Sequence, residues 1–315
     1  MILNYLRLTF SIEPEKTIIL PPYKGSALRG GFGSVFRRVV CVLKKETCSC
    51  CFLREQCAYS YIFETAPSPE SVPITLEKYE AIPRPFVIEP PKETKRIYKR
   101  GEKMDFNLVL IGRAIAYLPY FIIVFDELGQ IGLGQKKGNF HLKKVWNKGS
   151  LIYSNEKKTL KVVEPNIMEI PDQLEIKEST GSEIDMTLEF LTPVRLRYQR
   201  DLVVMPEFHI LIRNILRRLW LLSYFHGEMK EPSWNHREII EAAKEVRIKN
   251  SFLQWYDWER YSGRQKTRMR LGGLVGRISY HGRIRPFLPL IKAGSIFHVG
   301  KGTAFGLGEY AIIEE

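Results

Sequence analysis

Residues 294–310 read GSIFHVGKGTAFGLGEY, a segment in which five glycines accompany one lysine, one histidine and two phenylalanines. Glycine adopts positive φ and lets a backbone approach a ligand closely, and successive N–H groups in such loops form anion-binding concavities. Lys301 adds a positive charge. The segment lacks the spacing of the P-loop and of the dinucleotide-binding fingerprint. It therefore predicts binding of the phosphates of a polymer rather than those of a nucleotide cofactor.

The charge of the chain indicates the same kind of partner. Its 315 residues include 48 Lys and Arg against 35 Asp and Glu, which gives a net charge of +13. Such a balance favours an anionic partner. From Arg260 to Lys301 the chain has ten Lys and Arg and no acidic residue, with Tyr261, Tyr280 and His281 among them. Cations interleaved with stacking side chains suit single-stranded RNA.

A membrane is not an expected partner. A basic membrane-surface patch would need a long amphipathic helix, and Gly and Pro interrupt the basic stretch. The longest apolar runs, such as residues 118–125, are too short to span a bilayer. No signal peptide is visible. The sequence therefore predicts a cytoplasmic protein.

The two halves of the chain share one order of elements: strand, helix, strand, strand, helix, glycine loop, strand. Gly-Leu-Gly recurs at 132–134 and 306–308, after the second helix of each half. This order is that of the ferredoxin-like motif. We predict an α+β fold of two tandem ferredoxin-like (RRM-like) domains, residues 1–146 and 181–315, joined by a linker with a hairpin at 147–180. Helices are expected at residues 25–43, 115–128, 207–225, 238–246 and 287–292, and a glycine-rich loop at 294–308.

All five cysteines lie in residues 41–57, which predicts a cysteine-rich metal-binding insertion in the first domain. A disulfide framework is not expected in a large cytosolic chain. Without Cys50, the spacing is Cys-x6-Cys-x2-Cys-x5-Cys, formed by Cys41, Cys48, Cys51 and Cys57. Four such thiolates suit a structural zinc ion or a [4Fe–4S] cluster.

The cysteine spacing is similar to the iron–sulfur loop of certain DNA-repair glycosylases, which favours the cluster over zinc. Unliganded buried cysteines are the remaining alternative. A bound metal would hold in place a loop that carries Lys44, Lys45 and Arg54 towards RNA.

Three segments carry a family resemblance. They are the glycine-rich loop at 298–308, the run Asp257–Gln265 followed by Gly272-Gly273, and the helix start at 25–30. With these segments the chain resembles the CRISPR-associated endoribonucleases that process precursor CRISPR RNA, within the RAMP superfamily. The run from Asp257 to Gly273 is similar to one subgroup of these enzymes, and the cysteines indicate a cysteine-containing subgroup.

The resemblance implies a fold and a reaction. Members of this family fold as two tandem ferredoxin-like domains and cut CRISPR repeat RNA without a metal ion. The 2′-hydroxyl attacks the adjacent phosphate and leaves a 2′,3′-cyclic phosphate and a 5′-hydroxyl. This reaction needs a general base, an acid for the leaving oxygen and a cation for the phosphorane.

The candidate catalytic residues depart from the family pattern. In many members a histidine on or just after the first helix is the base, but here no histidine precedes His141. Catalysis must then use another histidine or Tyr/Lys chemistry, or be absent. Among the histidines we expect His298, at the entrance of the glycine loop, to act as base or acid, with support of the loop or RNA binding as its alternative roles. Lys301 would stabilise transition-state charge and Tyr261 would position the hydroxyl.

Two functions in different classes remain open. The first is the endoribonuclease, supported by the run from Asp257 to Gly273. The second is a non-catalytic subunit that binds CRISPR RNA within an effector complex of other CRISPR-associated proteins, supported by the missing early histidine. A third and more remote hypothesis is an iron–sulfur enzyme that binds DNA. The expected RNA-binding residues are Gly300, Gly302, Gly306, Gly308, Arg264, Arg268, Arg270, His281 and Arg29.

Overall fold

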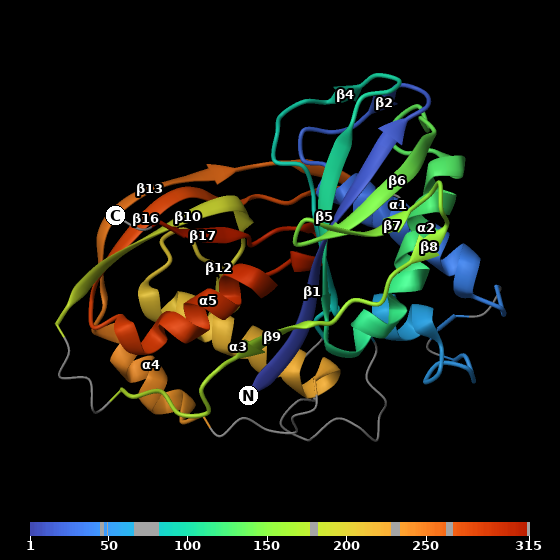
Figure 1. The fold of residues 1–315 in the computed structure, drawn as a ribbon. Helices are drawn as coiled ribbons and strands as arrows, with labels where there is room; N and C mark the ends of the chain where they lie inside the picture. The colour runs from blue at the N-terminus through green and yellow to red at the C-terminus, as the bar shows by residue number, and fades with distance from the viewer. Residues whose placement is uncertain are drawn as a thin grey trace. The chain divides into compact units, whose positions relative to one another are not determined.

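The structure is a computed structural model that describes residues 1–44, 47–48, 50–65, 82–176, 182–227, 234–262 and 267–313. The chain divides into two compact units. The amino-terminal unit comprises residues 4–166 and 225–227, and the carboxyl-terminal unit comprises residues 1–3, 167–224 and 228–315. Figure 1 shows the elements of both.

The amino-terminal unit contains an antiparallel sheet with the strand order β3-β5-β1-β6-β7-β8. Its strands are β1 (Ile2–Pro14), β3 (Phe86–Glu89), β5 (Met104–Ile111), β6 (Phe140–Asn147), β7 (Ser150–Ser154) and β8 (Thr159–Leu160). Its helices are α1 (Gly25–Val40) and α2 (Leu118–Ile131), and a short ladder joins β2 (Ile18–Ile19) to β4 (Ile97–Tyr98). A π-helix covers Ser60–Glu64, and a 3₁₀ helix covers Gly112–Tyr117.

Phenylalanines join the two helices of this unit to its sheet. The ring of Phe32 on α1 stacks on that of Phe121 on α2 with 4.7 Å between centroids, and Phe125 lies 5.2 Å from Phe10 on β1. The helical stretch Gly112–Ile131 is, within the described ranges, the one that meets the length and apolar composition of a membrane span. Phe121 and Phe125 belong to it and are fully buried, so it serves as a core helix.

The carboxyl-terminal unit contains a four-stranded antiparallel sheet with the order β13-β16-β10-β17. Its helices lie together on one face of this sheet (Figure 1). The strands are β10 (Ile184–Val194), β13 (Arg247–Tyr256), β16 (Gly273–Gly282) and β17 (Tyr310–Ile313), and the helices are α3 (Phe208–His226), α4 (His236–Lys244) and α5 (Leu288–Phe297). Two short ladders pair β11 (Arg197–Tyr198) with β12 (Asp201–Leu202) and β14 (Glu259–Ser262) with β15 (Thr267–Arg270).

Both units have the ferredoxin-like strand order. Counted along the chain, the four strands of each βαββαβ unit lie in the spatial order second, third, first, fourth, namely β3-β5-β1-β6 and β13-β16-β10-β17. This order places the two helices of the motif on one face of the sheet. The prediction of an α+β fold with tandem ferredoxin-like domains is confirmed.

Two segments differ in detail from the expected pattern. Helix α5 extends to Phe297, so Gly294 lies within the helix and the glycine-rich loop begins at His298. Gly294 fits there because a Cβ would lie 2.2 Å from the hydroxyl of Tyr310. Residues 147–180, expected as a linker with a hairpin, contribute β7 and β8 to the amino-terminal sheet, and β9 (Asn166–Glu169) pairs with β1.

Candidate nucleic-acid interface

The loop from His298 to Glu309 closes on itself between α5 and β17. Gly300, Gly302, Gly306 and Gly308 all have φ between 80° and 83°, the left-handed region that glycine adopts without strain. A Cβ on Gly308 would lie 1.9 Å from the carbonyl oxygen of Val299, and one on Gly300 would lie 2.5 Å from that of Arg195. These glycines are required by the packing of the loop itself.

Backbone donors of this loop are used inside the protein. The N–H groups of Val299, Phe305, Gly306 and Gly308 donate to backbone carbonyls, and that of Lys301 donates to the carbonyl of Arg195 over 3.0 Å. The side chain of Lys301 is exposed. These donors do not form the open anion-binding concavity that the glycine pattern predicts, so a phosphate contact at this loop falls chiefly to Lys301. The RNA-binding role of the four glycines remains a prediction.

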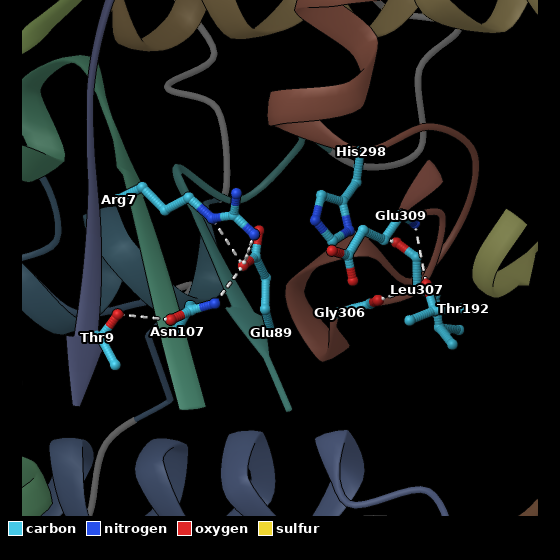
Figure 2. A network of polar contacts seen from close by, with 9 residues as sticks. All are labelled: Arg7, Thr9, Glu89, Asn107, Thr192, His298, Gly306, Leu307 and Glu309. Carbon is cyan, nitrogen blue, oxygen red and sulfur yellow. Dashed lines mark hydrogen bonds and ion pairs between the residues drawn. The ribbon is translucent and has the colours of Figure 1, made fainter. Parts of the chain in front are cut away.

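His298 lies under the loop. Its side chain is 1% exposed, and its Nδ1 atom is 3.0 Å from the carbonyl oxygen of Leu307 (Figure 2). Since a carbonyl only accepts, Nδ1 carries the proton and donates it. His298 has φ 61° and ψ 163°, a backbone conformation that favours glycine. This geometry gives His298 a loop-supporting contact, and its catalytic role remains a prediction.

Two buried polar side chains hold the ends of the loop. Nε of Arg218, on α3, donates a 2.7 Å hydrogen bond to the carbonyl oxygen of Phe297. Burial lowers the pKa of this guanidinium. Thr192, on β10, donates from Oγ1 to the carbonyl of Gly306 over 2.8 Å and accepts from the N–H of Glu309 over 2.9 Å (Figure 2). Sequence reasoning missed both residues, although Arg218 falls at helical spacing from Leu211, Ile215 and Leu222 on α3.

Arg195 connects the loop to Gly272, the residue before β16. Its carbonyl accepts from Lys301, and its guanidinium donates to the carbonyl of Gly272. Nε1 of Trp255 donates a 3.0 Å hydrogen bond to Oδ1 of Asp257. A Cβ on Gly272 would lie 2.3 Å from that indole nitrogen and 2.2 Å from that carboxylate oxygen. The run from Asp257 to Gly273 is therefore attached to the glycine-rich loop within one unit.

Strand β13 exposes three aromatic side chains. Phe252, Trp255 and Tyr256 are 74%, 41% and 38% exposed. Phe252 lies opposite Arg277 of β16, whose Nε is 3.1 Å from a carboxylate oxygen of Glu189. Exposed aromatic rings beside cations provide stacking platforms for single-stranded nucleic acid. Sequence reasoning did not single out these residues, although all three lie in one ten-residue strand.

The predicted basic residues after β13 lie on a hairpin. Tyr261 of β14 is paired with Arg268 of β15, and Glu259 with Arg270. The side chains of Tyr261, Arg268 and Arg270 are outside the described part of the structure, and Arg264 lies outside the described residues altogether. Backbone pairing thus brings Tyr261 and Arg268 to opposite positions of one ladder.

His281, on β16, is held by two carboxylates. Its Nδ1 is 2.7 Å from Asp185 and its Nε2 is 2.9 Å from Glu183. The hydrogen bonds to Asp185 and then to Glu183 raise the pKa of His281. Lys249 also pairs with Asp185. The predicted RNA-binding role of His281 remains a prediction, with its ring already engaged in this cluster.

Figure 2 also shows a polar network in the amino-terminal unit. Arg7 donates from Nε and Nη2 to Oε2 of Glu89 over 3.0 and 2.8 Å, and Asn107 donates to the same oxygen over 3.1 Å. Thr9 donates to Asn107 over 2.9 Å. Arg29 on α1, a predicted RNA contact, places its guanidinium 4.2 Å from the ring centroid of Phe63 and is half-buried.

The cysteine segment follows α1. None of the five cysteines forms a disulfide; Cys50 is exposed and the other four are half-buried. Burial raises the pKa of Cys48, and nearby Glu64, Cys41 and Cys57 raise it further. Within the described ranges, no three His, Cys, Asp or Glu side chains are arranged to hold a metal ion. Metal binding by Cys41, Cys48, Cys51 and Cys57 remains a prediction.

Comparison with protein families gives one match in each half of the chain. Residues 3–166 match the AF_1859_N family of amino-terminal domains. Residues 188–310 match the family described as CRISPR-associated endoribonuclease Cas6. An uncharacterized protein of Archaeoglobus fulgidus is 24% identical over 312 residues, which cover 93% of this chain and 92% of that protein.

Solved structures show the same fold at low sequence identity. Thermus thermophilus Cas6 has a TM-score of 0.54 at 14% identity, with 99% of each chain covered. A Cas6 product complex has a TM-score of 0.53 at 15% identity, with 98% of this chain and 100% of that chain covered. A partial Cas6-RT-Cas1–Cas2 complex has a TM-score of 0.55 at 14% identity, with 99% of this chain but 46% of that longer chain covered.

Proposed function

Because this chain belongs to the family of the AF_1859_N amino-terminal domain and carries the segment of the CRISPR-associated endoribonuclease Cas6 at residues 188–310, we propose that it binds and cleaves CRISPR repeat RNA. The observation that carries the proposal is the link between the glycine-rich loop and β13. Arg195 joins exposed Lys301 to Gly272, and Gly272 packs against Trp255 of β13. A cation for phosphate and rings for bases lie on one framework, as single-stranded RNA requires.

The proposed reaction is attack by the 2′-hydroxyl on the adjacent phosphate. The bond from O2′ to phosphorus forms and the bond from phosphorus to O5′ breaks, which leaves a 2′,3′-cyclic phosphate and a 5′-hydroxyl. A base takes the proton of the 2′-hydroxyl and an acid supplies one to O5′. In this proposal Lys301 stabilises the charge of the phosphorane, Tyr261 positions the hydroxyl, and His298 is the candidate for proton transfer. The reaction needs no metal ion.

The contact residues of this proposal come from the carboxyl-terminal unit and from α1. Arg268 and Arg270 would contact phosphates from β15, His281 would contact RNA from β16, and Arg29 from α1. Arg264, outside the described residues, would contact a further phosphate. Phosphate contacts of this kind fix position and carry no sequence information. We further propose that the protein works in the cytoplasm, where precursor RNA is made.

The cysteines have a structural role in the proposal. Cys41, Cys48, Cys51 and Cys57 would hold a [4Fe–4S] cluster or a zinc ion that fixes the loop after α1. Support comes from their spacing and from their four unpaired thiols. Thiolates of this number suit either group.

Two observations favour a second function. His298 is buried and donates to the carbonyl of Leu307, and no histidine precedes His141. This arrangement suits a subunit that binds CRISPR RNA without cutting it, with other CRISPR-associated proteins as partners.

Incubation with labelled repeat RNA in EDTA separates the two functions. The enzyme produces a fragment with a 5′-hydroxyl, which polynucleotide kinase labels directly, and a partner fragment with a cyclic phosphate. Tight binding without cleavage of any candidate repeat RNA would contradict the enzyme and support the binding subunit. Cleavage that needs added metal would contradict the proposed mechanism.

A further inference from the structure

Three loops meet at one end of the amino-terminal unit. They are residues 14–20, 90–103 and 132–139, which we call the basic end. The N–H of Gly101 donates to the carbonyl of Pro14 over 2.9 Å, and that of Gln135 donates to Ile19 over 3.0 Å. Figure 1 shows β2 and β4, which belong to two of these loops, side by side.

The basic end has a strong excess of positive charge. Its three segments contain nine Lys and Arg and three Glu, a balance of +6 within the chain's net +13. All nine cationic side chains are exposed. Lys95 pairs with Glu102 at 2.9 Å and Lys103 pairs with Asp105 at 2.7 Å. In the part of the chain that the structure describes, Lys16, Lys99, Arg100, Lys136 and Lys137 form no ion pair.

The framework beneath these cations is fixed by interior contacts. The side chain of Lys24 is fully buried, and its Nζ donates to the carbonyls of Pro22 and Glu93. The hydroxyl of Tyr98 donates to Oε1 of Glu93 over 2.7 Å. Leu20 and Arg96 exchange two hydrogen bonds, one from the N–H of Leu20 over 2.8 Å and one from Nε of Arg96 over 3.3 Å. A fixed framework reduces the entropy lost when a ligand binds.

The chemistry of the basic end fits a phosphate chain rather than bases. Tyr98 is the one aromatic residue of its three segments and is fully buried. The surface therefore offers charge without a stacking platform, unlike β13 with its exposed rings. Contacts of this kind give affinity that does not depend on base sequence.

We propose that the basic end is a second RNA-binding surface, which holds the phosphate backbone of the repeat RNA independently of the glycine-rich loop. This inference rests on the proposed function, because it assumes that the chain binds RNA. It goes beyond that function by assigning a role to the amino-terminal unit, namely sequence-independent binding of the RNA strand outside the site of cleavage.

A pair of matched triple variants tests the proposal. Lys99→Gln, Arg100→Gln and Lys137→Gln remove three charges from the basic end. Lys148→Gln, Lys157→Gln and Lys161→Gln remove three exposed charges elsewhere in the same unit. Affinities for a labelled repeat RNA and for a scrambled single strand of equal length are measured by fluorescence anisotropy in EDTA over a salt series. Thermal unfolding confirms that both variants are folded.

We expect the basic-end variant to lose about 2 from the slope of log affinity against log salt, because each single-strand phosphate contact contributes about 0.7. The loss should be equal for the two RNAs, and the control variant should keep the wild-type slope. Equal losses of slope in both variants would overturn the proposal, because they would show that RNA senses the net positive charge of the whole protein. An unchanged slope in the basic-end variant would also overturn the proposal, and an acidic protein would then be the candidate partner of this surface. If the wild-type protein binds neither RNA, the proposed function fails as well.

Discussion

The Nε atom of Arg218 donates a hydrogen bond of 2.7 Å to the carbonyl oxygen of Phe297, the last residue of α5. The bond joins the middle of α3 to the point where the glycine-rich loop begins. A cation at a helix carboxyl terminus is also favoured by the helix dipole. Arg218 therefore positions the backbone that leads to Lys301 without facing solvent itself.

Replacement of Arg218 should loosen the loop. Arg218→Met keeps much of the side-chain volume but leaves the carbonyl of Phe297 without its donor, which costs about 1–3 kcal/mol, and removal of the buried charge offsets part of this cost. We expect a net loss of about 1 kcal/mol in urea unfolding, together with weaker RNA binding. Arg218→Lys should also lose stability, since an ammonium does not reproduce the Nε geometry. Wild-type stability and affinity in both variants would contradict this role.

Two glycines of α1 should respond in opposite ways to alanine. A Cβ on Gly30 meets nothing within 4 Å, whereas one on Gly33 would lie 2.0 Å from Cζ of Phe63. Gly30→Ala should stabilise the protein by about 0.5–1 kcal/mol through helix propensity. Gly33→Ala should destabilise it by about 1–3 kcal/mol through overpacking. Urea unfolding of the two variants provides the measurement, and a shift of both in the same direction would contradict the close packing of Phe63 against position 33.

The sequence predicts the fold well because the pattern of each element is local. Alternating and helical periodicities, together with the repeated Gly-Leu-Gly at 132–134 and 306–308, indicate two βαββαβ units. The length of α5 was not predictable in this way. Gly294 is a poor helix former. The helix nevertheless has glycine at this position, because a Cβ there would collide with the hydroxyl of Tyr310, a residue of another element.

The candidate site is harder to predict from the sequence, because it too depends on contacts between residues far apart in the chain. Lys301 is exposed as its glycine neighbours suggest, but the burial of His298 depends on the carbonyl of Leu307 across the loop. The link from Arg195 to Gly272 joins residues 77 positions apart. Such a contact follows from the pairing of β10 with β16, and no pattern in the neighbouring residues of the sequence predicts it. Arg218 is the exception, because its place on the apolar face of α3 is readable from helical spacing.

His281 should titrate at a higher pH than an ordinary histidine. Asp185 and then Glu183 raise its pKa above the usual value of about 6.5. Because the folded-state pKa is the higher one, the stabilising contribution is fully present below about pH 6.5 and is lost as the pH rises through the raised value. NMR titration of the imidazole protons measures the shift.

Asp185→Asn should lower the pKa of His281 towards its usual value. Glu183→Gln should lower it less, since Asp185 makes the larger contribution. Tyr5→Phe, remote in sequence, serves as a control that changes no carboxylate. An unaltered titration of His281 in Asp185→Asn would mean that the carboxylate contact is absent in solution. Repeating the titration with bound RNA tests whether the ring also contacts phosphate.

The cysteine segment should contain one metal site per chain. Protein purified without oxygen should show either the visible absorption of a thiolate-bound cluster or one equivalent of zinc by mass spectrometry. Cys51→Ser should lose the metal and lower the melting temperature, because metal binding contributes to folding. Cys50→Ser is the matched control and should keep the metal. A wild-type protein free of both metals, or metal loss in Cys50→Ser alone, would contradict the assigned ligands.

His298 offers the sharpest test of the site, because two roles predict different losses. If its ring transfers a proton, His298→Ala should slow cleavage by about 10²–10⁴-fold and leave RNA affinity unchanged. If its ring supports the loop, loss of the bond to Leu307 should lower stability by about 1–3 kcal/mol and weaken RNA binding together with cleavage. The proposed enzyme requires the first pattern, whereas the 1% exposure of His298 favours the second, so the paired measurements decide which role His298 has.

His298→Gly adds a control for the backbone. Position 298 has φ 61°, which glycine adopts without strain. We therefore expect His298→Gly to be more stable than His298→Ala while it lacks the same imidazole. A higher RNA affinity in His298→Gly than in His298→Ala would show that RNA binding depends on the backbone geometry of the loop. Cleavage lost equally in both variants, at wild-type affinity and stability, would contradict the supporting role and assign the proton transfer to His298.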